Sequence, residues 1–284
     1  MSDRNYSLGI LFQDDAGSGL THDFFASILN GFKKGAEVLG YEITFINPIK
    51  EKLHGKSYLE HARVKKFDGV AVICADVKDQ DVVDLIESEI PTVTIDQAYN
   101  GVCSIMSDNA QGIRNLVYYI ADMGHKKIAY IYGDMNAVTS LRIKNFMEAC
   151  QEMGIIVPDE YLRASKYRNL AKTAFEAEEL LRLPDPPTCI IFPDDYAAIA
   201  GMNTIKARGL EIPADISIAA YDGLDIPSRY DPQITTIKQK CDDIGKVAAS
   251  KLIEIIEDPD NASIADISID TELIKGASVG KIYY

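Results

Sequence analysis

The sequence is short of positive charge and of long apolar runs. Its 284 residues hold 29 Lys and Arg against 43 Asp and Glu, a formal net charge of −14. Such a chain does not grip nucleic acid by a basic surface of its own, and it is not drawn to anionic membranes. No apolar run reaches the roughly 18 residues of a membrane span, and the start, MSDRNYSLGILF, lacks the basic region and long apolar segment of a signal peptide. We therefore expect a cytoplasmic protein with no membrane partner.

Cysteine is sparse and follows no framework. The five cysteines are odd in number and widely spaced: Cys74, Cys103, Cys150, Cys189 and Cys241. Four of them have apolar neighbours, where cysteine is usually a small buried hydrophobe. Reduced thiols in the cytoplasm fit this pattern better than disulfides do.

Familiar catalytic, metal and cofactor motifs are also missing. The loop Gly17-Ser18-Gly19 has His22 where a dinucleotide fingerprint needs its third glycine, and Asn47 in place of an acidic residue follows the second strand. Walker A, HExxH, GxSxG and CxxC patterns do not occur. The histidines are scattered and are expected at the surface or at helix caps: His22, His54, His61 and His125. We expect no catalytic residues, no metal and no cofactor.

What is present is a regular alternation of apolar strands and amphipathic helices. Hydrophobic residues make up 47% and charged residues 25%, as in globular proteins, and the length suggests two domains. Four predicted helices end at a glycine suited to a left-handed cap: Gly40, Gly124, Gly154 and Gly209. This punctuation predicts an α/β fold with mostly parallel sheets covered by helices on both faces.

The first half of the chain spells one complete α/β series. Strands are predicted over 6–12, 41–46, 70–74, 91–95 and 103–106, the last at a sheet edge, and helices over 23–39, 48–66, 79–89 and 109–123. Gly31 and Gly35 lie inside the first helix, where they require close packing to offset their cost.

The series then begins again without a flexible linker, which suggests several rigid crossings between two similar halves. Strands are predicted over 127–132, 189–192, 216–221 and 232–237, helices over 140–153, 169–183, 195–208 and 241–256, and a final extended segment over 263–274.

The stretch 190–223 carries the first candidate site residues. Its strand, helix and strand place Asp194 and Asp222 after two parallel strands, at the edge where open α/β sheets bind ligands. Arg142, near the start of a helix that follows another strand, is expected to reach the same edge. Carboxylates and a guanidinium together suit a hydroxylated small molecule. The alternatives are loop or cap roles for the acidic residues, with Asp195 as the cap, and a surface salt bridge for Arg142.

Four segments, in the same order, resemble motifs of the LacI family of transcriptional regulators. They are GHKKIAYI (124–131), SLRIKNFMEACQEMG (140–154), PADISIAAYDG (213–223) and QITTIKQ (233–239). The resemblance extends over almost the whole chain.

The resemblance implies a type I periplasmic binding protein-like fold, with two doubly wound parallel-sheet lobes joined by three crossover segments. The lobes would comprise 5–123 plus 239–260 and 124–238 plus 261–284. An effector would bind between them. The implied ligand-binding residues are Gln13, Asp14 and Phe24 in the first lobe and Arg142, Tyr167, Asp194 and Asp222 in the second.

The family also implies a homodimer that regulates transcription as a repressor. The family's N-terminal helix-turn-helix has no counterpart here, so operator DNA would be contacted through a domain missing from this chain. We expect the effector to be a neutral sugar or polyol, in preference to a phosphorylated compound, because the site offers many carboxylates and one candidate arginine. A solute-binding protein of a sugar transporter is the alternative, and an enzyme that uses Asp194 and Asp222 as acid and base is a third hypothesis.

Overall fold

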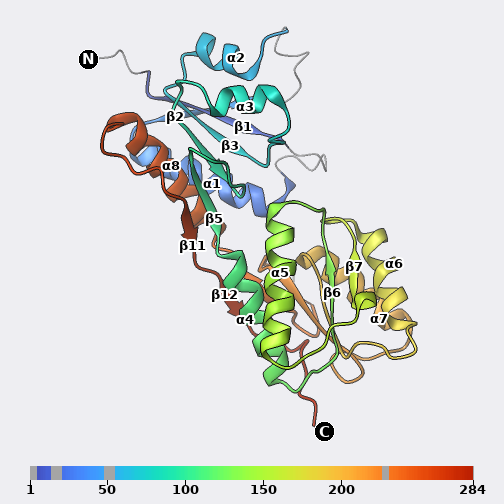
Figure 1. Cartoon of the computed structure of the whole chain (residues 1–284). Helices are drawn as coiled ribbons and strands as arrows, with labels where there is room; N and C mark the ends of the chain where they lie inside the picture. The colour runs from blue at the N-terminus through green and yellow to red at the C-terminus, as the bar shows by residue number, and fades with distance from the viewer. Residues whose placement is uncertain (1–4, 14–20, 48–54, 226–229, 284) are drawn as a thin grey trace. The chain divides into compact units, whose positions relative to one another are not determined.

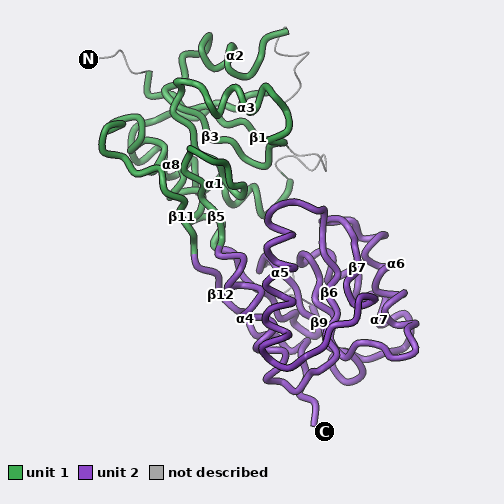
Figure 2. Tube along the Cα trace, viewed as in Figure 1, with its two compact units in different colours: residues 1–107, 240–269 green, residues 108–239, 270–284 purple. Residues whose placement is uncertain are grey.

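The chain forms two compact α/β units. A computed structural model describes residues 5–13, 21–47, 55–225 and 230–283. Unit 1 comprises 1–107 and 240–269, and unit 2 comprises 108–239 and 270–284 (Figures 1 and 2). The chain therefore passes between the units three times, and the predicted fold class, with two helix-covered parallel-sheet lobes, is confirmed.

The unit boundaries differ from the predicted lobe boundaries at the first and third crossings. Helix α4 (Asn109–Asp122), predicted in the first lobe, belongs to unit 2. Its apolar side chains Ile113, Leu116 and Ile120 are fully buried in a core that strands of unit 2 share. The first crossing thus precedes α4, and the third follows residue 269 instead of 260.

Unit 1 is built on a six-stranded sheet in the order β11-β5-β4-β3-β1-β2. Its strands, all parallel, are β1 (Ser7–Phe12), β2 (Glu42–Ile46), β3 (Gly69–Ile73), β4 (Thr92–Ile95), β5 (Cys103–Ser107) and β11 (Ile267–Ile269). The prediction that β5 lies at a sheet edge is wrong, because β11 pairs beside it. The residues near β5 in the sequence could not show this, because β11 comes from the C-terminal part of the chain.

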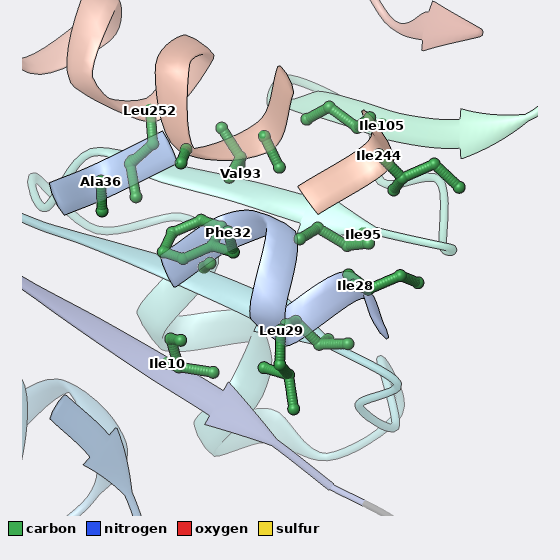
Figure 3. Packing of buried hydrophobic residues seen from close by; sticks show 14 of the residues in the cluster. Ile10, Ile28, Leu29, Phe32, Ala36, Val93, Ile95, Ile105, Ile244 and Leu252 are labelled. Atoms are coloured by element: carbon green, nitrogen blue, oxygen red, sulfur yellow. The ribbon is translucent and has the colours of Figure 1, made fainter. Parts of the chain in front are cut away.

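Helices cover both faces of this sheet. On one face lie α1 (Asp23–Val38) and α8 (Cys241–Glu257), whose side chains pack with those of β1, β3, β4 and β5 (Figure 3). On the other lie α2 (Tyr58–Lys65) and α3 (Gln80–Ile86). The helix predicted over 48–66 begins only at Tyr58, where the Ser57 and Glu60 side chains form a capping box; residues 48–54 lie outside the described residues.

The glycines inside α1 allow the close packing that the sequence predicted. A Cβ on Gly31 would lie 2.1 Å from the backbone oxygen of Asp242 in α8. A Cβ on Gly245, in α8, would lie 2.0 Å from the backbone oxygen of Ile28. The two helices therefore touch backbone to backbone, and this contact ties the 240–269 segment to the first part of the chain.

Unit 2 repeats the plan with the order β12-β10-β9-β8-β6-β7. Its strands are β6 (Ile128–Tyr132), β7 (Leu162–Ala164), β8 (Cys189–Ile191), β9 (Ser217–Asp222), β10 (Thr235–Lys238) and β12 (Glu272–Ile274), parallel except for β12. The sequence pattern did not predict the three-residue strand β7, and the final extended segment divides between β11 of unit 1 and β12 of unit 2.

Alternate residues of the unit 2 strands face two different helical layers. Ile128 and Tyr130 pack with α4 and α5 (Ala137–Glu152), whereas Ala129 and Ile131 pack with α6 (Leu170–Leu181) and α7 (Asp195–Ala207). The four predicted glycine caps are confirmed, because Gly40, Gly124, Gly154 and Gly209 have φ values of 80°, 97°, 65° and 76°.

One prediction about the histidines is wrong. His125 is neither exposed nor a helix cap, because its side chain is buried and both ring nitrogens are bonded. Nδ1 lies 2.9 Å from the Thr188 hydroxyl, and Nε2 lies 3.1 Å from the Gly280 carbonyl oxygen. Burial lowers the pKa of His125 below its ordinary value of 6.5.

Candidate functional site

Polar side chains gather where the parallel strands of unit 2 end. The carboxyl ends of β6, β7, β8 and β9 share one edge of the sheet, since neighbouring strands run in the same direction. Asp134, Tyr167 and Asp194 follow β6, β7 and β8, and Asp222 ends β9. The predicted placement of Asp194 and Asp222 after adjacent parallel strands is confirmed.

Asp194 takes the cap role that the sequence analysis left open as an alternative, and Asp195 does not. Asp194 is the cap of α7: its Oδ1 accepts from the Ala197 N–H at 2.8 Å, while its Oδ2 accepts from the Arg168 N–H at 2.8 Å. Asp195 was predicted as the cap, but it accepts from the Leu224 N–H and the Thr236 hydroxyl. The first helical residue points back toward the sheet here, so it meets β10 instead of its own helix end.

Both carboxyl groups are buried, and burial changes their ionisation. Burial raises the pKa of Asp194, and the N–H groups of Arg168 and Ala197 lower it by less. The pKa of Asp195 is raised well above its ordinary value, by burial first and then by the charge of Asp222. The two groups therefore hold protons more readily than exposed carboxylates do.

Arg142 projects from α5 into this edge of unit 2. Its side chain is only 3% exposed, its guanidinium carbon lies 3.7 Å from the centre of the Tyr221 ring, and its Nε donates to Oδ1 of Asn109 at 2.8 Å. Burial lowers the pKa of Arg142, but Tyr167, Tyr221, Tyr130 and Asp222 raise it by more, so the group remains a cation. No ion pair involves Arg142 within the parts of the chain that the structure describes. The surface salt bridge considered for it is thus replaced by a buried cation on an aromatic face.

Asp222 is held in an unusual backbone conformation. Its φ is 99°, a region that residues with a side chain rarely adopt, and its Oδ1 accepts from Nε2 of Gln239 at 2.7 Å. Gln239 is the last residue of unit 2 before the second crossing, and its N–H also donates to the Asp222 carbonyl. A residue at the candidate site is therefore bonded directly to a crossing segment.

Tyr167 lies close enough to Arg142 to raise the pKa of its guanidinium. Its hydroxyl lies 2.8 Å from that of Thr139, and its ring covers Gly133, where an added Cβ would lie 2.5 Å from the ring. Its neighbour Arg168, with φ of 55°, stacks its guanidinium 4.4 Å from the centre of the Tyr196 ring. The sequence reasoning missed Arg168 and Tyr196, although their positions next to Tyr167 and Asp195 could have suggested them.

The predicted ligand-binding residues of unit 1 that the structure describes make their contacts within that unit. The Gln13 amide donates to the Tyr58 hydroxyl at 2.9 Å and accepts from the Asp76 N–H at 3.0 Å. Phe24 is buried in the unit 1 core against Phe25. Asp14 lies outside the described residues. Of the unit 1 candidates that the structure describes, Gln13 is thus bonded on both sides within its own unit and Phe24 belongs to the core.

Within the described residues, no group of three or more His, Cys, Asp or Glu is arranged to hold a metal ion. Over the same parts of the chain, no helix is long and apolar enough to cross a membrane.

Comparison with known proteins assigns the family. A family model for a periplasmic binding protein-like domain matches residues 117–279. The chain is 31% identical over 244 residues to the HTH-type transcriptional repressor PurR of Photobacterium profundum, covering 84% of this chain and 72% of that protein. The chain belongs to the LacI family.

Other LacI-family relatives and structures agree. The chain is 26% identical over 285 residues to ExuR of Bacillus subtilis, a probable HTH-type transcriptional repressor, covering 98% of this chain and 82% of that protein. A regulatory protein of the LacI family from Chloroflexus aggregans has the same fold, with a TM-score of 0.85 at 20% identity, covering 97% and 99% of the two chains. The structure of a LacI-family regulator from Enterococcus faecium, solved with bound ribose, matches with a TM-score of 0.82 at 20% identity. The match covers 98% of this chain and 100% of that one.

The predicted resemblance is therefore confirmed: this is the periplasmic-binding-protein-like, effector-binding core of a LacI-family transcriptional regulator. Both relatives named above are described as transcriptional repressors, so the alternative of a transporter's solute-binding protein is not supported.

Proposed function

We propose that this LacI-family core binds a small hydroxylated effector, such as a sugar, at the carboxyl edge of the unit 2 sheet. The observation that carries the proposal is the convergence of Arg142, Tyr167 and Asp222 there, as a buried cation, an aromatic ring and a carboxylate. Such a set recognises both the polar groups and the apolar face of a ring-shaped ligand. Gln13, Asp14 and Phe24 of unit 1 remain predicted contributors.

We further propose that the core acts as a homodimer and carries the effector signal to operator DNA through a domain outside this chain. An effector that binds one conformation more tightly shifts the equilibrium toward it, and the Asp222 to Gln239 bond offers a direct connection from the site to a crossing segment. The protein would be cytoplasmic and would catalyse no reaction. The relatives named as repressors support this role.

Thermal melting of the purified chain tests the proposal. A panel of sugars, sugar phosphates, polyols, nucleobases and amino acids is screened, because a ligand that binds only the folded state raises the melting midpoint. We expect one chemical class to raise it, and Arg142→Met to abolish the shift while the circular dichroism spectrum is retained. The control is Arg182→Gln, which removes an exposed arginine of the same unit. An unresponsive chain that is also monomeric by sedimentation would contradict the proposed function.

A further inference from the structure

Arg168 occupies a fixed position at the candidate site. Its N–H donates to Asp194 Oδ2 at 2.8 Å, its φ of 55° sets the direction of the chain, and its guanidinium rests on the Tyr196 ring. Backbone and side chain are thus both constrained. A long cationic side chain loses considerable conformational entropy when it is ordered in this way, so the order requires a compensating interaction.

The donors of Arg168 are not all used. Its Nη1 is fully buried and has no hydrogen-bond partner, and no ion pair involves Arg168 within the described residues. Asp194 is the nearby carboxylate, but both of its oxygens already accept N–H groups. A buried donor without a partner is unfavourable in the ligand-free protein, and an acceptor on a ligand would remove that cost.

A second set of donors lies at the same edge. Arg142 uses its Nε on Asn109 and has no carboxylate partner among the described residues, and the Tyr221 hydroxyl beneath it is buried without a hydrogen bond. Tyr167 adjoins Arg168 in sequence and is among the residues that raise the pKa of Arg142. Arg142 therefore lies on Tyr221 at the end of β9, and Arg168 is bonded to Asp194 after the neighbouring strand β8, so both belong to the carboxyl edge of the unit 2 sheet.

The carboxylate oxygens predicted as ligand acceptors already accept hydrogen bonds from the protein. Asp194 and Asp195 each accept two hydrogen bonds from the protein, and Oδ1 of Asp222 accepts from Gln239. A neutral sugar needs acceptors for its hydroxyl protons, and part of the acceptor capacity of these carboxylates is already used by the protein. Nη1 of Arg168 and the Tyr221 hydroxyl are buried without a hydrogen bond, so the site favours a ligand that supplies acceptors.

The carboxylate of Asp222, and those of Asp194 and Asp195 when they are ionised, limit how much negative charge a ligand can bring. A phosphate carries nearly two charges at neutral pH and would be repelled more strongly than a carboxylate, which carries one. The planar fork of a guanidinium also matches the two oxygens of a carboxylate.

We propose that Arg168 is a specificity-determining residue that selects an effector bearing a carboxylate on a hydroxylated skeleton. This inference rests on the proposed function, because it assigns a chemical class to the ligand of the same site.

Matched pairs of compounds test the inference by calorimetry and melting. Each pair differs in one carboxylate: glucose with glucuronate, galactose with galacturonate, and glucitol with gluconate, alongside glucose 6-phosphate and galactose 6-phosphate. We expect one acid to bind and its neutral partner to bind at least about tenfold more weakly. Arg168→Gln should weaken binding of the acid by about 10- to 100-fold. The affinity for the neutral compound of the same pair should not change.

Two controls separate charge and geometry from stability. Arg168→Lys keeps the charge but loses the planar fork, so its affinity for the acid should fall between those of the parent and Arg168→Gln. Arg182→Gln should have no effect. Unchanged melting of the ligand-free variants excludes misfolding.

The opposite results would overturn the inference. Tighter binding of a neutral sugar or a sugar phosphate than of any acid would refute it while leaving the proposed function intact. Tighter binding of a nucleobase would contradict both. Equal affinity of Arg168→Gln and the parent for the acid would refute the role of Arg168. If none of these compounds bound, the carboxylate class would be rejected, and the wider panel with sedimentation would decide on the proposed function separately.

Discussion

At the carboxyl edge of unit 1, the Gln13 amide is bonded on both sides to its own unit, through Tyr58 and Asp76. At the same edge of unit 2, Arg142 and Arg168 lie on tyrosine rings and have no ion-pair partner within the described residues. The two units share a sheet order and differ in how far their polar groups are committed. Polar groups that the protein has already satisfied stabilise the fold, whereas unsatisfied donors indicate where a ligand binds.

The largest difference we expect between the units concerns backbone packing. Gly245→Ala in unit 1 would place a Cβ 2.0 Å from the Ile28 carbonyl oxygen and should lower the free energy of unfolding by about 3 kcal/mol. Gly209→Ala in unit 2 meets no atom within 4 Å and should cost only about 1 kcal/mol, for its left-handed φ of 76°. Urea unfolding measures both. Equal costs would show that α1 and α8 can separate without penalty.

Effector affinity compares the carboxyl edges of the two sheets directly. Once an effector is known, Arg142→Met should weaken its binding by about 100-fold, because a buried charged donor is lost. Gln13→Met should weaken binding by less than about tenfold, and it should lower stability by about 1 kcal/mol because the Tyr58 hydroxyl and Asp76 N–H lose their partner. Calorimetry and urea unfolding give the two quantities. A larger affinity loss for Gln13→Met would reverse the assignment of specificity to unit 2.

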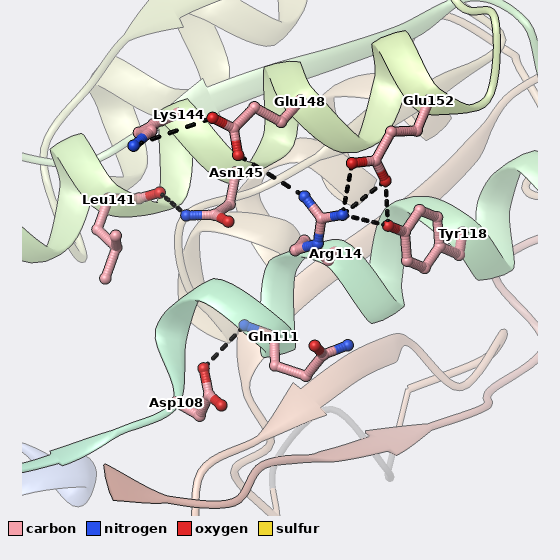
Figure 4. A network of polar contacts seen from close by, with 9 residues as sticks. All are labelled: Asp108, Gln111, Arg114, Tyr118, Leu141, Lys144, Asn145, Glu148 and Glu152. Carbon is pink, nitrogen blue, oxygen red and sulfur yellow. Dashed lines mark hydrogen bonds and ion pairs between the residues drawn. The ribbon is translucent and has the colours of Figure 1, made fainter.

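The rule that committed polar groups stabilise the fold can be tested within unit 2. Glu176 is 5% exposed and accepts from Arg163 and Lys172, so Glu176→Gln should cost about 1 to 2 kcal/mol in urea unfolding. Glu152 binds Arg114 and Tyr118 at the protein surface (Figure 4), where water and salt screen the charges. Glu152→Gln should therefore change the unfolding midpoint much less. The rule is contradicted if Glu152→Gln lowers the free energy of unfolding by more than Glu176→Gln does.

The smallest effect that we expect is a difference between two histidines in how they make stability depend on pH. The pKa of His125 in unit 2 is lowered from 6.5 by burial, and that of His61 in unit 1 by weaker burial and by Lys65 and Lys56. Below pH 6.5 the unfolded chain binds more protons than the folded chain, so stability falls as the pH falls from 6.5 through the folded pKa. His125→Gln should flatten this dependence more than His61→Gln does, as urea unfolding at pH 5 to 8 would record. The raised pKa values of Asp194 and Asp195 act in the opposite direction, but they are common to parent and variants.

Much of the fold could be read from local patterns. Apolar runs identified the strands, and glycine caps identified the helix ends, because both depend on neighbours within a few residues. The assignments of β5 as an edge strand and of α4 to the first lobe failed, because β11 and the unit 2 core come from distant parts of the chain. Strand β7 was missed because its three residues, two of them half-exposed and one exposed, are too few to show an apolar period.

The candidate site was predicted in outline and corrected in detail. Strand ends placed Asp194, Asp222 and Arg142 at one edge, since parallel strands make that placement a matter of topology. Which oxygens remain available could not be predicted. That depends on the N–H groups of Arg168 and Leu224, which reach Asp194 and Asp195 from other loops.

The sequence by itself determined the family, the two α/β units and the residue types that gather at the unit 2 sheet edge, because motif order and periodicity are properties of the chain alone. Only the tertiary structure decided that Asp194 caps α7, that Asp195 binds β10, and that Arg168 lies on the Tyr196 ring. The physical reason is that hydrogen-bond commitment and desolvation depend on the groups that surround each side chain, and folding brings those groups together from distant parts of the sequence.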